Sequence, residues 1–363
     1  MEDFSQVSQS SVRNPLTWAV VSEYRNVLFG VSIALILFFH IYYLCAPNVR
    51  VHDALEVFRF GNGAVDVFMF LSALGLYFSF RRSPQVAGFF KKRIVRILPV
   101  FVLVVIPETV WYHHCVYPQG SLLWDILGVS WVTDDHKTFW FLYAILVAYA
   151  AFPLLYSYME RAQSQRGALV RMLILIGVTV VATAWLSYAH PTAYSRLEIG
   201  MGRVPAFLLG CVAGKLAFEK APLKGWHLLA LLIAGYGCFG LCQVFTGAFP
   251  EVMLSRVYRG LYFILGSIML CVIMKAVGAN PKTKVMNWLG TRSLEIFVVQ
   301  MTVQSLWGRY GHHVLSTPDF INQVVFVLVF AGVSIALGGL VHLVCKPAVD
   351  ILSGKRSVIQ AKQ

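Results

Sequence analysis

The sequence predicts an all-α integral membrane protein, a bundle of about ten transmembrane helices. Composition is the first reason, because 58% of the residues are hydrophobic and 13% are charged, whereas soluble domains have about 45–50% and about 25%. The second reason is that the apolar residues gather into stretches of about 20, the length at which a helix spans a bilayer.

Windows of this kind lie near residues 26–47, 63–80, 97–112, 139–157, 169–187, 203–218, 226–246, 255–277, 289–308 and 322–345. No interruption between them is long enough for a separate soluble domain. We therefore expect one transmembrane domain over residues 26–348, an N-terminal tail of residues 1–25 and a C-terminal tail of residues 349–363.

The first window is expected to remain in the membrane as a helix. It follows a mainly polar segment, residues 1–25, and it is longer than the apolar core of a signal peptide. It also lacks an A-x-A cleavage site.

The orientation follows from the connection between the second and third windows. This segment, "RRSPQVAGFFKKRIVR", has six basic residues and no acid, so the positive-inside rule places it in the cytoplasm. Alternation then places basic segments inside throughout, among them those with Arg161, Arg166 and Arg171 and with Lys215, Lys220 and Lys224. Both termini are predicted to be cytoplasmic.

The net charge of +13 does not indicate nucleic-acid binding, because the basic residues are spread over short loops and form no single face. We expect these loops to contact membrane lipid. The seven cysteines have no CxxC spacing, and the adjacent pairs His113/His114 and His312/His313 direct their side chains apart. The sequence therefore predicts neither a nucleic-acid partner nor a metal site.

His40 is the first candidate for chemistry, because an ionisable group in hydrocarbon costs at least about 2.5–3.5 kcal/mol. It lies in "GVSIALILFFHIYYL", about 21 Å along a helix that starts near Asn26. A neutral imidazole accepts and returns a proton near pH 7, as a general base on an acceptor hydroxyl must. The alternative is a histidine that hydrogen-bonds between helices and serves packing alone.

Asp66 lies about one turn inside the second window, in "GNGAVDVFMFLSALGLYF". If the first two helices form an antiparallel hairpin, its carboxylate lies near the depth of His40 and can fix the imidazole tautomer. A carboxylate here also suits the N-terminus of its own helix, where the dipole favours an acid. The two roles are compatible.

The run "FFKKRIVRILPVF" places Arg93 and Arg96 three residues apart, on one face at the cytoplasmic mouth of the third helix. Guanidinium groups bind phosphate oxygens well, so the pair is a candidate for holding a phosphorylated cofactor or a lipid headgroup. The alternative is that the cluster only orients the chain and contacts anionic lipid.

Aromatic and acidic side chains mix in the long outer loop between the third and fourth windows, and Trp140 and Tyr143 follow at the start of the fourth. Glu108 is an acid within the third window. Rings and carboxylates suit sugars and their hydroxyl groups, although the aromatic belts of membrane interfaces have the same composition.

Six motifs in this order resemble the bacterial membrane acyltransferase family 3, whose members include O-acetyltransferases of surface polysaccharides. They are "GVSIALILFFH", "GAVDVFMFLSALGLYF", "FFKKRIVRILPVF", "FWFLYAILVAYAAFPLL", "GRVPAFLLG" and "LGTRSLEIFVVQ". The resemblance implies that acyl-coenzyme A, in the simplest case acetyl-coenzyme A, binds from the cytoplasm. The acyl group would then pass to a hydroxyl of a glycan or lipid-linked sugar outside a bacterial cytoplasmic membrane.

The same resemblance implies roles for individual residues. His40 corresponds to the family's essential histidine, and Arg93 and Arg96 to an arginine pair that would hold coenzyme A phosphates. Asp66 corresponds to the acid of a Gly-Val-Asp element and Arg203 to the arginine of an R-x-P-x-F-L-L-G element.

Trp140 and Tyr143 correspond to the aromatic stretch at the start of the fourth helix and are expected to bind substrate, together with Glu108 and Gln300.

The sequence departs from the family pattern at several positions. Phe29 stands eleven residues before His40, where the family usually has a basic residue, and we expect Arg25, one turn lower on the same face, to substitute for it. Gln300 stands where a histidine is often found, and Ala64 and Ala73 replace glycines.

The resulting hypothesis is direct transfer, in which His40, oriented by Asp66, deprotonates an acceptor hydroxyl and Arg203 stabilises the oxyanion. A ping-pong cycle through acylated His40 is the alternative chemistry. A proton-coupled transporter or flippase would also place charges in the membrane, but it predicts an inverted repeat that the sequence lacks. A catalytically silent partner in glycan assembly is suggested by Phe29 and Gln300.

Overall fold

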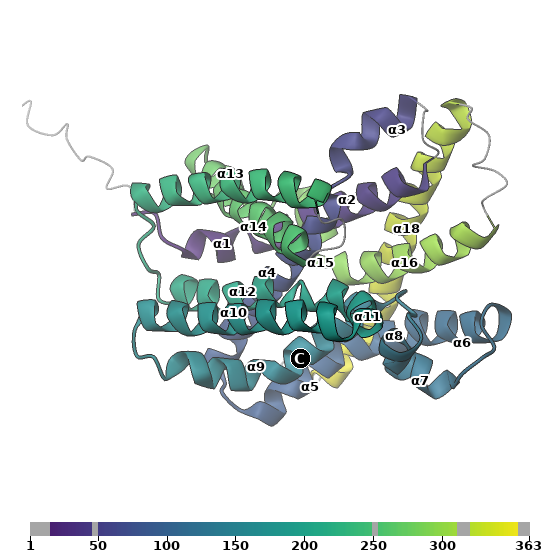
Figure 1. The fold of residues 1–363 in the computed structure, drawn as a ribbon, viewed down its shortest axis with the longest axis horizontal. Helices are drawn as coiled ribbons and strands as arrows, with labels where there is room; N and C mark the ends of the chain where they lie inside the picture. Colours follow the sequence, from purple (N-terminus) through teal and green to yellow (C-terminus); the bar gives the residue numbers. More distant parts are fainter. Residues whose placement is uncertain (1–14, 46–49, 249–252, 311–319, 355–363) are drawn as a thin grey trace, which may run out of the picture.

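The computed structural model describes residues 15–45, 50–248, 253–310 and 320–354, and the regular structure of this part is helical (Figure 1). The first half contains α1 (Ala19–Glu23), α2 (Arg25–Leu44), α3 (Arg50–Leu55), η1 (Glu56–Phe58), η2 (Gly61–Gly63), α4 (Ala64–Arg82), α5 (Val86–Val100), the π-helical η3 (Phe101–Val105), α6 (Ile106–Cys115), α7 (Leu122–Leu127), α8 (Val129–Thr133) and α9 (Trp140–Glu160). The second half contains α10 (Gln165–Ala189), α11 (Pro191–Met201), α12 (Val204–Phe218), α13 (Gly225–Ala248), α14 (Met253–Ala276), α15 (Lys284–Thr291), α16 (Ser293–Tyr310) and α18 (Phe320–Leu352).

The predicted all-α membrane fold is confirmed. Within the described residues, eight helical spans are long and apolar enough to cross a membrane: 25–44, 50–82, 86–115, 140–160, 165–189, 191–218, 255–276 and 320–352. The two remaining windows, 226–246 and 289–308, also form helices, α13 and α16. α16 carries several polar residues, which matter for the site.

Several spans are longer than the windows of the sequence, among them the third (window 97–112) and the sixth (window 203–218). Helix α5 begins at Val86 and continues through η3 into α6, so the third span is 30 residues long. The π-helical turn follows Pro99, which lacks the N–H that a regular ladder needs. Helix α11 precedes α12 and meets it at a turn at Gly202 and Arg203, so the sixth span covers residues 191–218 instead of 203–218.

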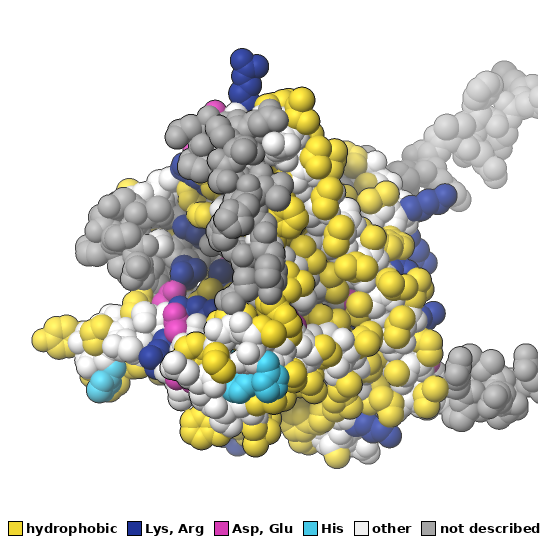
Figure 2. Space-filling model, turned by 90° about the vertical axis from the view of Figure 1, so that its right-hand side faces the viewer, with side chains coloured by type: hydrophobic (Ala, Val, Ile, Leu, Met, Phe, Trp, Pro, Cys, Tyr) yellow, Lys and Arg dark blue, Asp and Glu magenta, His cyan; other side chains and the backbone are white. Residues whose placement is uncertain are grey.

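Helix α4 is the centre of the bundle and packs against α2, α9, α12 and α14. The α12 contact is close because Gly210 and Gly214 form a G-x-x-x-G stripe against α4, and a Cβ at Gly210 would lie 2.2 Å from the carbonyl oxygen of Phe70. Large hydrophobic side chains remain exposed around the bundle, as expected for a lipid-facing surface. Figure 2 shows such apolar side chains covering one flank, beside a group of basic and acidic side chains.

Part of the segment expected as an N-terminal tail packs on the domain. Trp18 N–H donates to the carbonyl of Ala221 (2.9 Å), and Leu223 N–H donates to that of Leu16 (2.8 Å). Val21 and Tyr24 are buried. Residues 1–14 and 355–363 lie outside the described residues, so the cytoplasmic location of the termini stays a prediction.

Candidate active site

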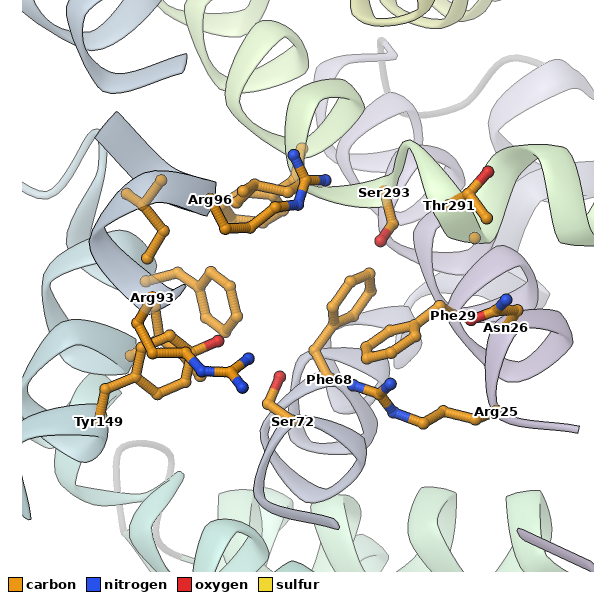
Figure 3. A pocket seen from close by; sticks show the side chains of 16 residues that line it. Arg25, Asn26, Phe29, Phe68, Ser72, Arg93, Arg96, Tyr149, Thr291 and Ser293 are labelled. Atoms are coloured by element: carbon orange, nitrogen blue, oxygen red, sulfur yellow. The ribbon is translucent and has the colours of Figure 1, made fainter. Parts of the chain in front are cut away.

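A cavity of about 310 Å³ lies where α2, α4, α5, α9, α15 and α16 meet, and we call it the arginine cavity (Figure 3). Its polar lining comprises Arg25, Asn26, Ser72, Arg93, Arg96, Tyr149, Thr291 and Ser293. Its apolar lining includes Phe29, Phe68, Phe141 and Phe297. It therefore combines positive charge, hydroxyl groups and aromatic walls.

Arg25 is the first residue of α2, and its side chain reaches across to α4. Its Nε donates to the carbonyl of Leu71 (3.0 Å), and the guanidinium lies 5.0 Å from the ring centre of Phe29. The room for it comes from Gly75, because a Cβ there would lie 2.4 Å from Nη2 of Arg25. Arg25 thus places a positive charge in the cavity that Phe29 also lines, and its predicted substituting role stays a prediction.

Arg93 and Arg96 both line the cavity but have different partners. Arg96 binds the fully buried Glu295 of α16 through Nη1–Oε1 (2.5 Å) and Nη2–Oε2 (3.0 Å). His342 of α18 approaches the same carboxylate, with Nδ1 3.1 Å from Oε1. Arg93 has no acidic partner among the described residues, and its Nε is buried without a hydrogen bond.

The two arginines are therefore not equivalent, although the sequence presents them as a pair. The charge of Arg96 is balanced by Glu295, and the ion pair joins α5 to α16. Arg25 and Arg93 are the cavity guanidinium groups that no carboxylate of the described residues balances. In Figure 3 both point toward the space beside Ser72.

His40 lies on α2, fifteen residues beyond Arg25, which corresponds to about 22 Å along the helix. Its Nδ1 is 3.3 Å from Nε2 of Gln300 on α16. Among the described residues its Nε2 has no hydrogen-bond partner. His40 is thus held at one ring nitrogen and open at the other.

The tautomer of His40 depends on the amide of Gln300. With the Gln300 N–H donating to Nδ1, the imidazole proton sits on Nε2, and His40 is a hydrogen-bond donor. Rotating the amide by half a turn brings its oxygen to Nδ1, which then carries the proton and leaves Nε2 as a base. Oε1 of Gln300 is buried without a partner in the first orientation, which favours exchange between the two.

Asp66 does not orient His40, so that prediction is wrong. Its buried carboxylate is bound by Nη1 of Arg203, the residue that precedes α12. Arg203 is itself buried and lies 5.9 Å from the ring centre of Trp140. This pair joins the beginning of α4 to the beginning of α12, away from the lining of the arginine cavity.

The arrangement changes the expected roles of both residues. The carboxylate of Asp66 lies in the first turn of α4, where the helix dipole also favours it. Arg203 is committed to this carboxylate and lines no part of the arginine cavity, so the structure does not support its role in stabilising an oxyanion there. Gln300 takes the position beside His40 that Asp66 was expected to have.

Trp140 and Tyr143, expected to bind substrate, have contacts of another kind. Trp140 is buried beside Phe141 and under Arg203. The hydroxyl of Tyr143 lies 3.2 Å from the carbonyl oxygens of both Asp125 and Ile126 and supports the end of α7. Neither residue lines the arginine cavity.

Glu108 lies in the first turn of α6 and is buried, and among the described residues no well-aligned hydrogen bond reaches either carboxylate oxygen. It faces Ser305 of α16. On the same helix, Gln300, Gln304 and Trp307 follow at intervals of four and three residues, and each has a buried polar atom that no described residue hydrogen-bonds. Gln300, Gln304 and Trp307 lie on one face of α16 and form a polar track from His40 toward the C-terminal end of that helix, which Glu108 adjoins at Ser305.

A histidine cluster lies where the third span ends and joins His113 of α6 and His136 of the loop after α8 to Asp125 of α7. Nδ1 of His113 is 2.8 Å from Oδ2 of Asp125, and Nδ1 of His136 is 3.9 Å from Oδ1. His136 stacks on Tyr112, and burial lowers its pKa while Asp125 acts in the opposite direction. The rings of His113 and His114 are nearly perpendicular, whereas His312 and His313 lie outside the described residues.

Comparison with known proteins places this geometry in a family. A family model described as an acyltransferase domain matches residues 26–343. The chain belongs to the acyltransferase 3 family. Acyltransferase MdmB of Streptomyces mycarofaciens is 22% identical over 338 residues, which cover 85% of this chain and 86% of that protein. No solved structure matches the chain.

Membership of the acyltransferase 3 family confirms the predicted resemblance and makes the chain a multi-pass membrane acyltransferase. The match starts one residue after Arg25, so this cavity residue falls outside it. Within the match, Glu295 and His342 are site residues to which the sequence reasoning assigned no role. The spacing of Gln300, Gln304 and Trp307 is readable in "QMTVQSLW" and could have revealed the polar track.

Proposed function

We propose that this acyltransferase transfers an acyl group, in the simplest case acetyl, from acyl-coenzyme A to a hydroxyl of a glycan or lipid-linked sugar. The donor would enter from the cytoplasm and the acceptor from the outer side of a bacterial cytoplasmic membrane. One observation carries the proposal. Helix α2 joins the arginine cavity, where Arg25 and Arg93 have no carboxylate partner among the described residues, to His40, which lies about 22 Å along the helix and contacts Gln300 through Nδ1 only.

The arginine cavity suits the donor in charge and shape. Arg25 and Arg93 are free to bind phosphate oxygens, for which guanidinium groups are well matched. The aromatic walls suit an apolar linker, and the hydroxyl groups of Ser72, Thr291 and Ser293 are available for hydrogen bonds. When bound, acyl-coenzyme A supplies an acyl group activated as a thioester.

The polar track suits the acceptor. Glu108, Gln304 and Trp307 hold buried polar atoms without a well-aligned partner in the part of the chain that the structure describes, and such atoms are costly unless a hydrogen-bonding group meets them. Sugar hydroxyls both donate and accept hydrogen bonds, so they satisfy a carboxylate, an amide oxygen and an indole N–H alike. An acceptor in this track would reach the open Nε2 of His40.

In the proposed reaction, Nε2 of His40 takes the proton of the acceptor hydroxyl as its oxygen attacks the thioester carbonyl. The new C–O ester bond forms, the C–S bond breaks, and His40 returns the proton to the departing sulfur. In the rotated orientation of its amide, Gln300 accepts a hydrogen bond from Nδ1–H of His40 and so leaves Nε2 free to act as the base. No step requires Asp66 or Arg203, which we assign to the support of α4 and α12.

The test is transfer of radiolabel from acetyl-coenzyme A to a panel of glycan acceptors by the purified protein in lipid. His40→Gln should lower the rate by about 10²- to 10⁴-fold, the usual share of a general base. Arg161→Gln, which changes an exposed cation of the same membrane side, should leave it unchanged. Transfer that survives His40→Gln would refute the mechanism.

The same experiment separates the rival functions. A transporter or flippase would not transfer label and would not bind coenzyme A in the arginine cavity. A catalytically silent partner would bind no donor or would bind it without turnover on any acceptor. Label that accumulates on the protein before the acceptor is added would indicate the ping-pong route instead of direct transfer.

A further inference from the structure

A second large cavity opens on the side of the bundle, between α10, α12, α13 and α14, and we call it the lateral groove. Its volume is about 670 Å³, compared with about 310 Å³ for the arginine cavity. Helices α10 and α14 both pack on α12, which forms the floor between them (Figure 1). The walls are mainly apolar and include Leu169, Leu209, Val212, Leu216, Ile264, Leu265 and Ile268.

One end of the groove is polar and positively charged. Gln165, Arg166, Lys224 and His227 lie there, and the lining contains no Asp or Glu. The acid Glu219 accepts a hydrogen bond from Gln165 (2.8 Å) and pairs with Lys215 (3.0 Å). The exposed side chains of Arg166 and Lys224 have no acidic partner among the described residues.

Two tryptophans mark the same end. Trp18 and Trp226 line the groove beside the cations, and Trp226 is 64% exposed. Its ring centre lies 3.7 Å from that of His227. Tryptophan is enriched at the level of lipid headgroups, and Arg166 and Lys224 belong to segments that the charge pattern places on the cytoplasmic side. The positive end therefore lies at the expected headgroup level of the inner leaflet.

We propose that the lateral groove binds one anionic phospholipid of that leaflet. The phosphate lies between Arg166 and Lys224, and an acyl chain follows the groove from Leu216 toward Leu209, about 10 Å along α12. A lipid fits both ends of the groove, because the cations need an anion and the apolar walls need a hydrocarbon chain. This inference is independent of the acyl-transfer reaction.

The test is native mass spectrometry of the full chain in detergent, titrated with phosphatidylglycerol or phosphatidylcholine of matched chains. Two basic residues should favour phosphatidylglycerol by about 30-fold. The variant Arg166→Gln/Lys224→Gln should lose this preference. The matched control Arg161→Gln/Lys346→Gln removes two exposed cations elsewhere on the same side and should keep it.

A second variant tests the hydrocarbon part of the proposal. Leu169→Trp fills the groove from a position that is already 39% exposed, so the fold should tolerate it, and binding of both lipids should fall. Equal retention of the two lipids by the unaltered chain would overturn the proposal. Three other results would overturn the proposal as well: glycerol phosphate without acyl chains competes with the lipid, the chain prefers a polyprenyl phosphate, or the chain forms a dimer that Leu169→Trp dissociates.

Discussion

The clearest prediction concerns the two arginines of α5, which the sequence presents as a pair and the structure separates. Arg93→Gln removes a guanidinium that no carboxylate of the described residues balances, so its effect should fall on donor binding. A hydrogen bond to a charged group contributes about 1.5–3 kcal/mol, which corresponds to a rise of about 10- to 150-fold in the dissociation constant of acetyl-coenzyme A. The stability of the protein should change little.

Arg96→Gln should have the opposite profile. It leaves the fully buried carboxylate of Glu295 without its arginine partner, and removing one partner of a buried ion pair lowers the free energy of unfolding by about 3–5 kcal/mol. We expect the lower end of this range, because Arg96 is 37% exposed and His342 also contacts the carboxylate. The main result should be a lower midpoint of thermal unfolding.

Two measurements decide between these outcomes: calorimetric titration with acetyl-coenzyme A, and thermal unfolding in the same detergent. The double variant Arg96→Leu/Glu295→Leu is the control, because replacing both members of a buried pair by apolar groups is often neutral. It should recover most of the stability that Arg96→Gln loses. The reasoning is refuted if Arg93→Gln destabilises the protein as much as Arg96→Gln, or if it leaves donor affinity unchanged.

Three further predictions test the rest of the site. Arg25→Ala should weaken acetyl-coenzyme A binding. Adding Phe29→Arg to this variant should restore part of the binding, because both side chains line one cavity. Unchanged acyl transfer in Arg25→Ala would contradict the substituting role. Gln300→Leu removes the hydrogen bond to His40 and should lower kcat by about 2- to 13-fold, which corresponds to the free energy of a neutral hydrogen bond. Gln300→Glu should retain activity. Equal losses of activity in the two variants would argue against an orienting role. Glu108→Gln should raise the midpoint of thermal unfolding, since a buried carboxylate without a well-aligned partner among the described residues opposes folding. The same variant should raise KM for the acceptor but not for the donor. A change in donor KM alone would contradict acceptor binding at the polar track.

The fold was predictable because hydrocarbon imposes simple requirements on length and polarity. Each of the ten apolar windows overlaps helical structure in the described residues, since backbone groups in a membrane must be satisfied within the segment itself. The extended third span was missed because α5 begins with the basic residues of "FFKKRIVR", which an apolar window excludes. Helix α16 was predicted, although its polar residues set it apart from the eight apolar spans.

The site was predictable by residue type but not by partner. The sequence marks ionisable residues within the apolar windows or at their ends, such as His40, Asp66 and Arg96, as costly in a membrane, but it cannot say which helices bring them together. Antiparallel pairing of the first two helices suggested that Asp66 lies beside His40. The structure instead pairs each of them with a helix more than a hundred residues later in the chain, through contacts that local spacing does not encode.

Charge pairing then separates arginines that support the fold from those that can bind a ligand. Arg96 and Arg203 each bind a buried carboxylate, so a second anion would have to compete with a charge already in place. Arg25 and Arg93 instead face a common cavity without a carboxylate, and a buried positive charge is stabilised when an anion reaches it. We therefore expect the phosphates of the proposed acyl-coenzyme A donor to bind where the protein leaves the charge unbalanced, a difference that the resemblance between Arg93 and Arg96 in sequence conceals.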